Sequence, residues 1–317
     1  METLQLFFIS FGFTYLIYPY FIRFMNRRNA AQSVSEYALD SFKQKAKTPT
    51  IGGLVFLLVP LVSFIFYKHY RFDNPHLNLL LITYFVYGLI GFVDDVKILI
   101  EKNNAGLPAA LKFLLQVLFA AILYTVFKSS LSTIVNIPLL NIDIDFGYFY
   151  MILVLFMLSG ASNGVNLTDG MDGLAGGTVL ISLIGFAYIA YFKNEILVLT
   201  FIVSIMGSLA SYLMFNWHPA KIFMGDTGSL PLGAVLAALA MVLKLELVLL
   251  VLGAVFVVET ICVSLQIFWV KTFKKRLFRY TPIHYSFTLA GHKEVHVVLM
   301  FYVFGLISMI LGVWLAL

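Results

Sequence analysis

Five aspartates at the ends of long apolar runs are the side chains best suited to chemistry in this chain: Asp94, Asp95, Asp169, Asp172 and Asp226. An ionised carboxylate next to hydrocarbon is costly unless a cation or a partner neutralises it. Several such groups on one side of a membrane therefore indicate a functional site. We expect that site to bind a phosphorylated, metal-bound ligand.

Asp94 and Asp95 are adjacent in the string GFVDDVKIL. Two neighbouring carboxylates repel each other, and a divalent cation or a shared proton relieves that repulsion. The alternative is a solvated helix end, which is the commoner meaning of an isolated Asp-Asp pair. An Asp-rich motif of the prenyl-synthase type is disfavoured, because it needs a third aspartate where this chain continues Val96, Lys97, Ile98.

The segment SNGVNLTDGMDGLAGG (162–177) mixes glycines with polar side chains. Glycine lets the backbone approach a ligand closely, while Asn, Thr and Asp supply the groups that recognise polar atoms. The Asp spacing and the missing terminal Glu exclude an EF-hand loop. The alternative is a Gly-rich turn capped by Asp172 or Thr168. A cap explains one polar residue but not the whole set of Asn163, Asn166, Thr168, Asp169 and Asp172.

The segment FNWHPAKIFMGDTGSL (215–230) carries Asn216, Phe223 and Asp226. Taken alone, Asp226 is interpreted as the N-cap of the following helix, where the helix dipole would also stabilise it. The flat ring of Phe223 on a wet loop is suited to stacking on a base. We interpret His218 as a loop histidine, because the spacing identifies no partner for it.

A basic segment, KTFKKRLFRYTPIHYSFTLAGHKE (271–294), follows the ninth apolar run. Its positive charges suit a substrate that bears phosphates. The alternative is the ordinary excess of basic residues in cytoplasmic loops. His284 is the member that we single out, as a candidate phosphate ligand. Glu259 stands inside the preceding apolar run and needs an internal partner, so we expect it to hold helices together.

The composition identifies the element type that must position these groups. The chain has 317 residues, of which 61% are hydrophobic and 12% charged, and its mean hydropathy is +0.94. A soluble domain averages roughly 25% charged residues, so we expect an all-α integral membrane protein with about ten transmembrane helices. The continuous apolar runs lack the alternation of a barrel. The ten spans are Leu4 to Ile22, Ile51 to Tyr67, Leu77 to Val93, Leu111 to Phe127, Tyr148 to Ser162, Leu174 to Phe192, Ile196 to Phe215, Ser229 to Leu243, Leu247 to Val270 and Val295 to Leu317.

Most of the 21 Lys and Arg residues lie in the loops after the odd-numbered spans. Basic loops stay in the cytoplasm, so we expect both termini to be extracytoplasmic and the aspartates to face the cytoplasm. The first span has no basic residue before it and is not a cleavable signal. The net charge of +5 points to anionic lipid or a phosphorylated substrate as partner, with no need to invoke nucleic acid. The single cysteine, Cys262, cannot form an intrachain disulfide, and we treat residues 1–317 as one domain.

Five strings together resemble the polyprenyl-phosphate N-acetylhexosamine-1-phosphate transferases: KTPTIGGL, GFVDDVKIL, NGVNLTDGMDGLAGG, FNWHPAKIFMGDTGSL and PIHYSFTLAGHKE. The resemblance covers essentially the whole chain, and the third and fourth strings are highly specific in combination. Within that superfamily, the chain is most similar to the branch that uses a muramoyl-pentapeptide donor.

The resemblance implies transfer of phospho-MurNAc-pentapeptide from its UDP carrier to undecaprenyl phosphate, which yields lipid I and UMP and requires Mg²⁺. This reaction is the first membrane step of peptidoglycan synthesis. The implied partners are a UDP-sugar nucleotide, a polyprenyl phosphate, the bilayer of a bacterial plasma membrane and a second copy of the chain in a homodimer.

The resemblance also implies roles for residues. Asp94 and Asp95 would be the essential acidic pair, one of them acting as base on the lipid phosphate, and His284 would open a histidine cluster. Asp226 would bind Mg²⁺, with Asp169 beside it and with Asp94, Asp95 and Asp169 as further candidate ligands. The implied substrate-binding residues are Lys45, Asn166, Gly170, Met171, Asp172, Asn216 and Phe223, of which Phe223 would stack on uracil.

The chain departs from the family at the histidine cluster. The family usually has three successive histidines, whereas here His284 is followed by Tyr285 and Ser286. This departure keeps open a sister enzyme that transfers GlcNAc-1-phosphate or a related sugar, and a catalytically lapsed paralogue. A secondary transporter is the alternative outside enzymes, but transporters usually bind near the membrane midplane.

Overall fold

The computed structural model describes residues 2–28, 45, 48–66, 73–101, 106–140 and 142–317 of the chain. Its apolar runs form helices because a helix pairs the backbone polar groups that hydrocarbon cannot satisfy. The elements are α1 (Glu2–Arg27), α3 (Gly53–Ile65), α4 (Pro75–Glu101), α5 (Ala109–Phe127), β1 (Ile134–Ile137), β2 (Ile142–Asp145), η2 (Gly147–Phe149), α6 (Tyr150–Thr168), α7 (Leu174–Phe192), α8 (Ile196–Asn216), α9 (Asp226–Leu243), α10 (Leu249–Leu252), α11 (Ala254–Phe273), α12 (Ile283–Leu289) and α13 (Glu294–Ala316).

The expected all-α multi-pass membrane architecture is confirmed. Within the described residues, nine helices are long and apolar enough to cross a bilayer. The expected second span is a shorter helix, α3, of 13 residues, which rises only about 20 Å against a hydrocarbon core of about 30 Å.

Two features differ from the sequence-based expectation. The expected ninth span is divided at Gly253 into the short α10 and the long α11. In addition, β1 and β2 form an antiparallel hairpin, with Ile134 opposite Asp145, in the stretch between the expected fourth and fifth spans. A four-residue strand gives too weak an alternation to recognise in a sequence.

The helix α9 lies at the centre of the bundle and is buried along nearly its whole length. It packs along α4 on one side and α6 on another. Small residues make this approach possible: a Cβ added at Gly91 of α4 would overlap the backbone of Asp226, and one at Gly233 would overlap the backbone of Ala161. Close packing through small residues is typical of membrane helices. It brings the first turn of α9 against the α4 segment that carries Asp94 and Asp95.

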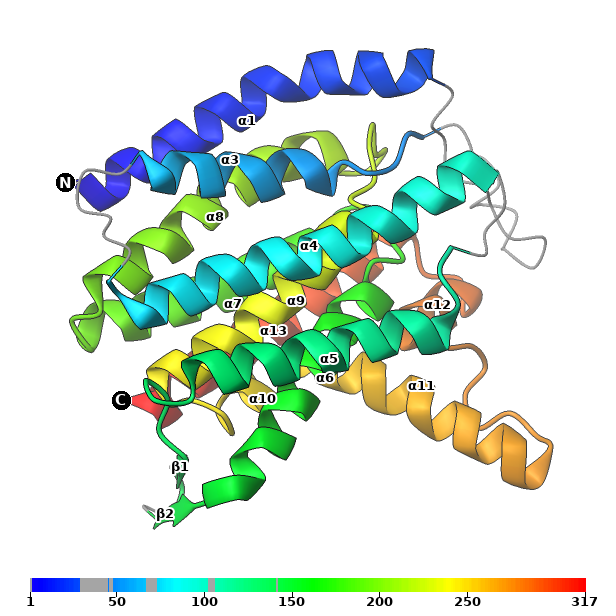
Figure 1. Cartoon of the computed structure of the whole chain (residues 1–317). Coiled ribbons are helices and arrows are strands. Elements are labelled where there is room, and N and C mark those ends of the chain that lie inside the picture. The colour runs from blue at the N-terminus through cyan, green and yellow to red at the C-terminus, as the bar shows by residue number, and fades with distance from the viewer. Residues whose placement is uncertain (1, 29–44, 46–47, 67–72, 102–105, 141) are drawn as a thin grey trace.

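The polar segments gather at one end of the bundle (Figure 1). The helices α4, α6 and α8 end there, and α9, α12 and α13 begin there. Both termini lie at the other end of the bundle. This arrangement agrees with aspartates and termini on opposite sides of a membrane.

Candidate active site

Asp94, Asp95 and Asp226 form one group, which we call the carboxylate cluster. One ligand oxygen from each lies within 4.8 Å of the others. Asp94 and Asp95 are buried on α4, and Asp226 is the first residue of α9. Three carboxylates at this separation repel one another unless a cation is present. Their hard oxygen atoms are the donors that Mg²⁺ or Ca²⁺ prefers, so the donor set fits a divalent cation.

Asp95 also holds the start of α9. Its Oδ1 accepts the Asp226 N–H at 3.1 Å, and its Oδ2 accepts the Thr227 N–H at 2.9 Å and the Thr227 hydroxyl at 2.6 Å. The expectation that Asp226 is the N-cap is therefore wrong, because the cap position is Gly225 and the carboxylate comes from another helix. Gly225 has φ +67°, and a Cβ there would overlap Asp95, so this turn requires glycine.

Lys112, on α5, contacts the carboxylate cluster. The sequence analysis did not predict it as a site residue. Its Nζ lies 2.5 Å from Asp226 Oδ2 and 3.6 Å from Asp94 Oδ1. Lys112 therefore supplies part of the positive charge that the three carboxylates need. The available signal was a lysine one residue inside an apolar run, which usually marks a functional position in a membrane protein.

Asn166 lies beside Asp226. Its Nδ2 donates to Asp226 Oδ1 at 2.6 Å and to Ser229 Oγ at 2.9 Å. Asn166 is in the last turn of α6, since this helix extends to Thr168. The polar residues of segment 162–168 thus project from a helix that continues beyond Ser162, where we expected the fifth span to end.

Asp169, directly after α6, lies outside the carboxylate cluster. Within the described residues, no hydrogen bond or ion pair to its side chain is found. Burial, together with repulsion from Asp226, Asp95 and Asp172, raises the pKa of Asp169 to about 8. The carboxyl group is thus poised to exchange a proton near neutral pH.

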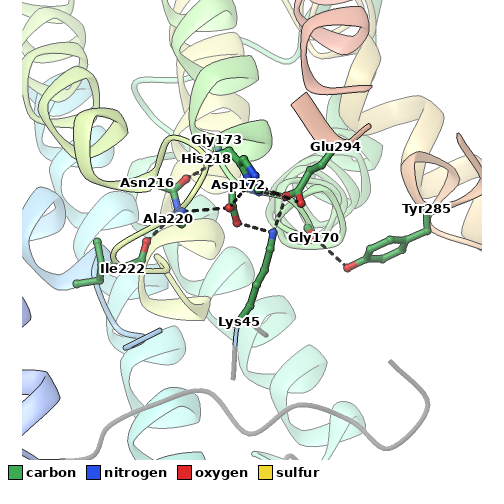
Figure 2. A network of polar contacts seen from close by, with 10 residues as sticks. All are labelled: Lys45, Gly170, Asp172, Gly173, Asn216, His218, Ala220, Ile222, Tyr285 and Glu294. Carbon is green, nitrogen blue, oxygen red and sulfur yellow. Dashed lines mark hydrogen bonds and ion pairs between the residues drawn. The ribbon is translucent and has the colours of Figure 1, made fainter. Parts of the chain in front are cut away.

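A second polar network surrounds Asp172 (Figure 2). Lys45 Nζ lies 2.6 Å from Asp172 Oδ1 and 2.5 Å from Glu294 Oε1, and the Asp172 N–H donates to Glu294 Oε1 at 2.8 Å. Asp172 and Lys45 are among the substrate-binding residues that the sequence predicted, whereas Glu294 was missed. It is the first residue of α13, and no spacing in the sequence connects it with residues more than 100 positions earlier.

His218 belongs to the same network, so its interpretation as a loop histidine without a partner is wrong. Its Nδ1 lies 2.9 Å from Asp172 Oδ2, which also accepts the Ala220 N–H at 3.1 Å. Asp172, His218 and Glu294 are close enough to share an ion, but they offer two carboxylates and an imidazole, whereas the carboxylate cluster offers three carboxylates and Mg²⁺ prefers oxygen ligands. The carboxylate cluster is therefore the better candidate for a divalent cation.

Asn216 and Phe223 connect this network to the start of α9. Asn216 Oδ1 accepts the Gly173 N–H at 2.9 Å, and its Nδ2 donates to the Ile222 carbonyl at 2.9 Å. The Phe223 backbone pairs with Pro49 and Gly52, and its ring is partly exposed. Asn216 is buried and holds the backbone on both sides, while Phe223 stays partly exposed.

Gly170 and Met171 form the turn between Asp169 and Asp172. Met171 is buried, and the Gly170 carbonyl accepts a hydrogen bond from the Tyr285 hydroxyl at 3.1 Å. Burial raises the pKa of Tyr285, so its hydroxyl stays protonated and donates. Ser286 instead bonds the backbone of Tyr280. Of these two departures from the histidine cluster, Tyr285 thus hydrogen-bonds the Gly170 turn, whereas the hydrogen bonds found for the Ser286 hydroxyl within the described residues go to Tyr280.

His284 is fully buried and pairs with Glu259 through Nδ1 at 2.8 Å. This gives Glu259 the internal partner that we expected for it. The basic residues earlier in the segment are exposed on α11 and after it. Within the described part of the chain, no hydrogen bond or ion pair joins these basic residues to the carboxylate cluster or to the Asp172 network. The basic residues concerned are Lys271, Lys274, Lys275, Arg276 and Arg279.

Comparison with known proteins identifies the family. Residues 77–244, which hold the carboxylate cluster and most of the Asp172 network, match the profile of "Glycosyl transferase family 4". The chain is 43% identical over 310 residues to a phospho-N-acetylmuramoyl-pentapeptide-transferase of Halalkalibacterium halodurans, covering 97% of this chain and 95% of that protein. It is 40% identical over 318 residues to proteins of the same name from Bacillus pumilus and Bacillus subtilis, covering 99% of this chain and 98% of each relative. The chain therefore belongs to glycosyl transferase family 4 and, within it, to the phospho-N-acetylmuramoyl-pentapeptide-transferases.

Proposed function

We propose that this protein transfers phospho-MurNAc-pentapeptide from UDP-MurNAc-pentapeptide to undecaprenyl phosphate, forming lipid I and UMP. The observation that carries the proposal is the convergence of Asp94, Asp95 and Asp226 at the end of a membrane bundle. A site at that boundary lets a water-soluble nucleotide meet a lipid whose tail stays in the bilayer. The names of the full-length relatives support the same reaction.

The cofactor that we propose is Mg²⁺, held by Asp94, Asp95 and Asp226. When bound, it neutralises the donor pyrophosphate and stabilises charge on the departing UMP. Asn166 holds Asp226 through Oδ1, and Asp95 holds the backbone that carries it. Lys112 supplies a further positive charge to the phosphates. Overall, an oxygen of the lipid phosphate bonds to the β-phosphorus as the bond from that phosphorus to the UMP oxygen breaks.

The Asp172 network is the proposed seat of the nucleotide. Phe223 presents a partly exposed ring for stacking on uracil, and Asn216 holds the segment before it. Lys45 offers an ammonium group at the edge of the same network. Asp169 precedes Asp172 by three residues in the same turn region. Either Asp94 or Asp95 acts as base on the lipid phosphate.

We further infer that the protein lies in a bacterial plasma membrane, with this end of the bundle in the cytoplasm and both termini outside. The distribution of Lys and Arg over the loops supports this orientation. The resemblance to the family also implies a homodimer, which stays a prediction.

The second candidate within enzymes is transfer of GlcNAc-1-phosphate. The observation that favours it is Tyr285, which replaces a histidine of the family's cluster and contacts the Gly170 turn. A secondary transporter is disfavoured because the carboxylates gather at one end of the bundle, whereas transporters usually bind near the midplane.

The test is UMP release by the purified protein with undecaprenyl phosphate and either UDP-MurNAc-pentapeptide or UDP-GlcNAc, with and without Mg²⁺. We expect Mg²⁺-dependent release with the first donor alone. Release with UDP-GlcNAc alone would transfer the assignment to the sister enzyme. Uptake of a solute into proteoliposomes without any UMP would favour the transporter.

A further inference from the structure

Glu259, on α11, is fully buried and belongs to neither group of carboxylates. Its Oε2 accepts the Ile283 N–H at 2.7 Å. Its Oε1 accepts the His284 N–H at 3.3 Å and lies 2.8 Å from His284 Nδ1. An ionised carboxylate can only accept hydrogen bonds, so the paired Nδ1 carries a proton. Glu259 therefore fixes both the first turn of α12 and the orientation of the His284 ring.

The other ring nitrogen, His284 Nε2, is buried and has no hydrogen-bond partner within the described residues. It faces Gly170, where an added Cβ would overlap Nε2 and lie against the Tyr285 hydroxyl. Buried polar atoms without a partner are uncommon and call for an explanation, such as a ligand that is bound in the working state. Nε2 thus points at the turn that carries Asp169 and Asp172.

A negative charge is not needed merely to hold a loop segment against α11 by hydrogen bonds to its backbone. Two turns further along α11, Gln266 ties down the next segment with a neutral amide: its Oε1 accepts the Leu277 N–H at 3.0 Å and the Phe278 N–H at 2.9 Å. A buried carboxylate costs more free energy than an amide unless its charge is used. Opposite a histidine, that charge is used when Nε2 carries a proton as well as Nδ1, and such an Nε2–H can donate to an anion.

We propose that Glu259 is a positioning residue for the transfer reaction, holding His284 through Nδ1 so that Nε2 is presented beside Gly170 to a phosphate oxygen of the substrate. The proposal rests on the proposed function and deepens it. His284 is then the group that contacts substrate, and Glu259 acts only through it.

The test is a double-mutant cycle on the full-length purified protein, with UMP release as the readout. Glu259→Gln keeps the shape and one acceptor oxygen but removes the charge. We expect kcat to fall about 10- to 100-fold, the loss typical when the outer partner of an oriented imidazole is removed. We expect the donor KM to change less than about threefold, since the lost interaction is made mainly in the transition state.

The second arm of the cycle compares His284→Ala with the double variant Glu259→Gln/His284→Ala. If Glu259 acts through His284, the Gln substitution adds less than about a twofold loss once the ring is gone. A wild-type kcat in Glu259→Gln, or an equal loss in both backgrounds, would overturn the proposal in favour of a tether. The matched control is Glu246→Gln, which removes another buried carboxylate, bonded to the Tyr150 hydroxyl beyond the other end of α9. We expect this control to retain kcat.

A measurement on the unmutated chain covers the case in which Glu259→Gln does not fold. With ¹⁵N-labelled histidine, the proposal requires the His284 signals to report a protonated Nδ1. A neutral ring protonated only at Nε2 would contradict it. Failure of the proposed function is recognised separately, because the wild-type protein would then release no UMP from either donor.

Discussion

The carboxylate of Asp95 caps the helix that begins at Asp226, which lies 131 residues later in the chain. In the carboxylate cluster, one oxygen of the same carboxylate also lies within 4.8 Å of a carboxylate oxygen of Asp226. One aspartate thus sets the position of another, so the two have different effects when they are substituted.

Asp226→Asn should abolish Mg²⁺-dependent UMP release without unfolding the protein, because it removes one carboxylate of the proposed cation site and keeps the side-chain shape. We expect a loss of activity of at least about 100-fold. In EDTA we expect a nearly unchanged melting temperature, because the substitution relieves repulsion from Asp94 and Asp95 but also removes the ion pair with Lys112. Asp73→Asn, at an exposed position, is the control and should behave as wild type. Full activity in Asp226→Asn would reject the assignment of the metal site.

Asp95→Asn should lower both activity and stability. The amide keeps one acceptor oxygen but loses the second set of hydrogen bonds to the start of α9, and the loss of a helix cap costs about 1–2 kcal/mol. A melting temperature below that of Asp226→Asn, measured in the same detergent and in EDTA, is the expected result. Equal melting temperatures for the two variants would show that the capping contacts do not stabilise α9.

Lys112→Gln should strengthen binding of the divalent cation while it slows the reaction. Lys112 neutralises Asp226 when no cation is present, so an incoming cation must displace a charge-assisted hydrogen bond. Its removal should lower the Kd for Mg²⁺ about tenfold, or ~1.4 kcal/mol. Titration calorimetry on the detergent-solubilised protein measures the Kd. A weaker affinity in the variant would mean that Lys112 supports the cation site instead of competing with it.

Asp169→Asn should change how stability depends on pH. The pKa of Asp169 is raised from 3.8 to about 8 in the folded protein, so between these values the folded state binds more protons than the unfolded state. Stability therefore falls as pH rises through this window, and Asn removes that contribution. In EDTA, the melting temperature of the variant relative to wild type should rise from pH 4 to pH 8. A constant difference across this range would contradict the prediction.

Glu294→Gln should weaken binding of the nucleotide donor more than it slows turnover. Glu294 holds both Lys45 and the Asp172 backbone but lies outside the carboxylate cluster. We expect the donor KM to rise about tenfold or less, with kcat changed less than KM. The ratio of the two effects, measured by UMP release, decides the assignment. A selective loss of kcat would place Glu294 nearer to the reacting phosphates.

Much of this site was predictable because the membrane constrains it. Apolar runs of fixed length place Asp94, Asp169 and Asp226 at span ends, and the distribution of positive charge places those ends on one side. Helices that cross the same bilayer can be arranged side by side in only a few ways, so side chains at span ends on one side are expected to lie close together. Asn166 and Asp172 followed from the same segments.

The unpredicted contacts are pairs whose partners are far apart in sequence. Asp172 contacts His218 and Glu294, which are 46 and 122 residues later. Lys112 reaches Asp226 over 114 residues. Neither periodicity nor spacing encodes which helix faces which, because that depends on side-chain packing along α9. The sequence did not predict the break between α10 and α11 at Gly253, because the residues on both sides of it are equally apolar.

The central position of α9 means that it has almost no surface on which substitutions are free. Gly233 lies two turns below Asp226, roughly 10 Å along the helix axis, and is packed against Ala161. A bulkier residue there would push α6 away from α9 and carry Asn166 off Asp226. A screen for inactive variants of this chain would thus recover changes deep in the bilayer whose phenotype copies the loss of a metal ligand.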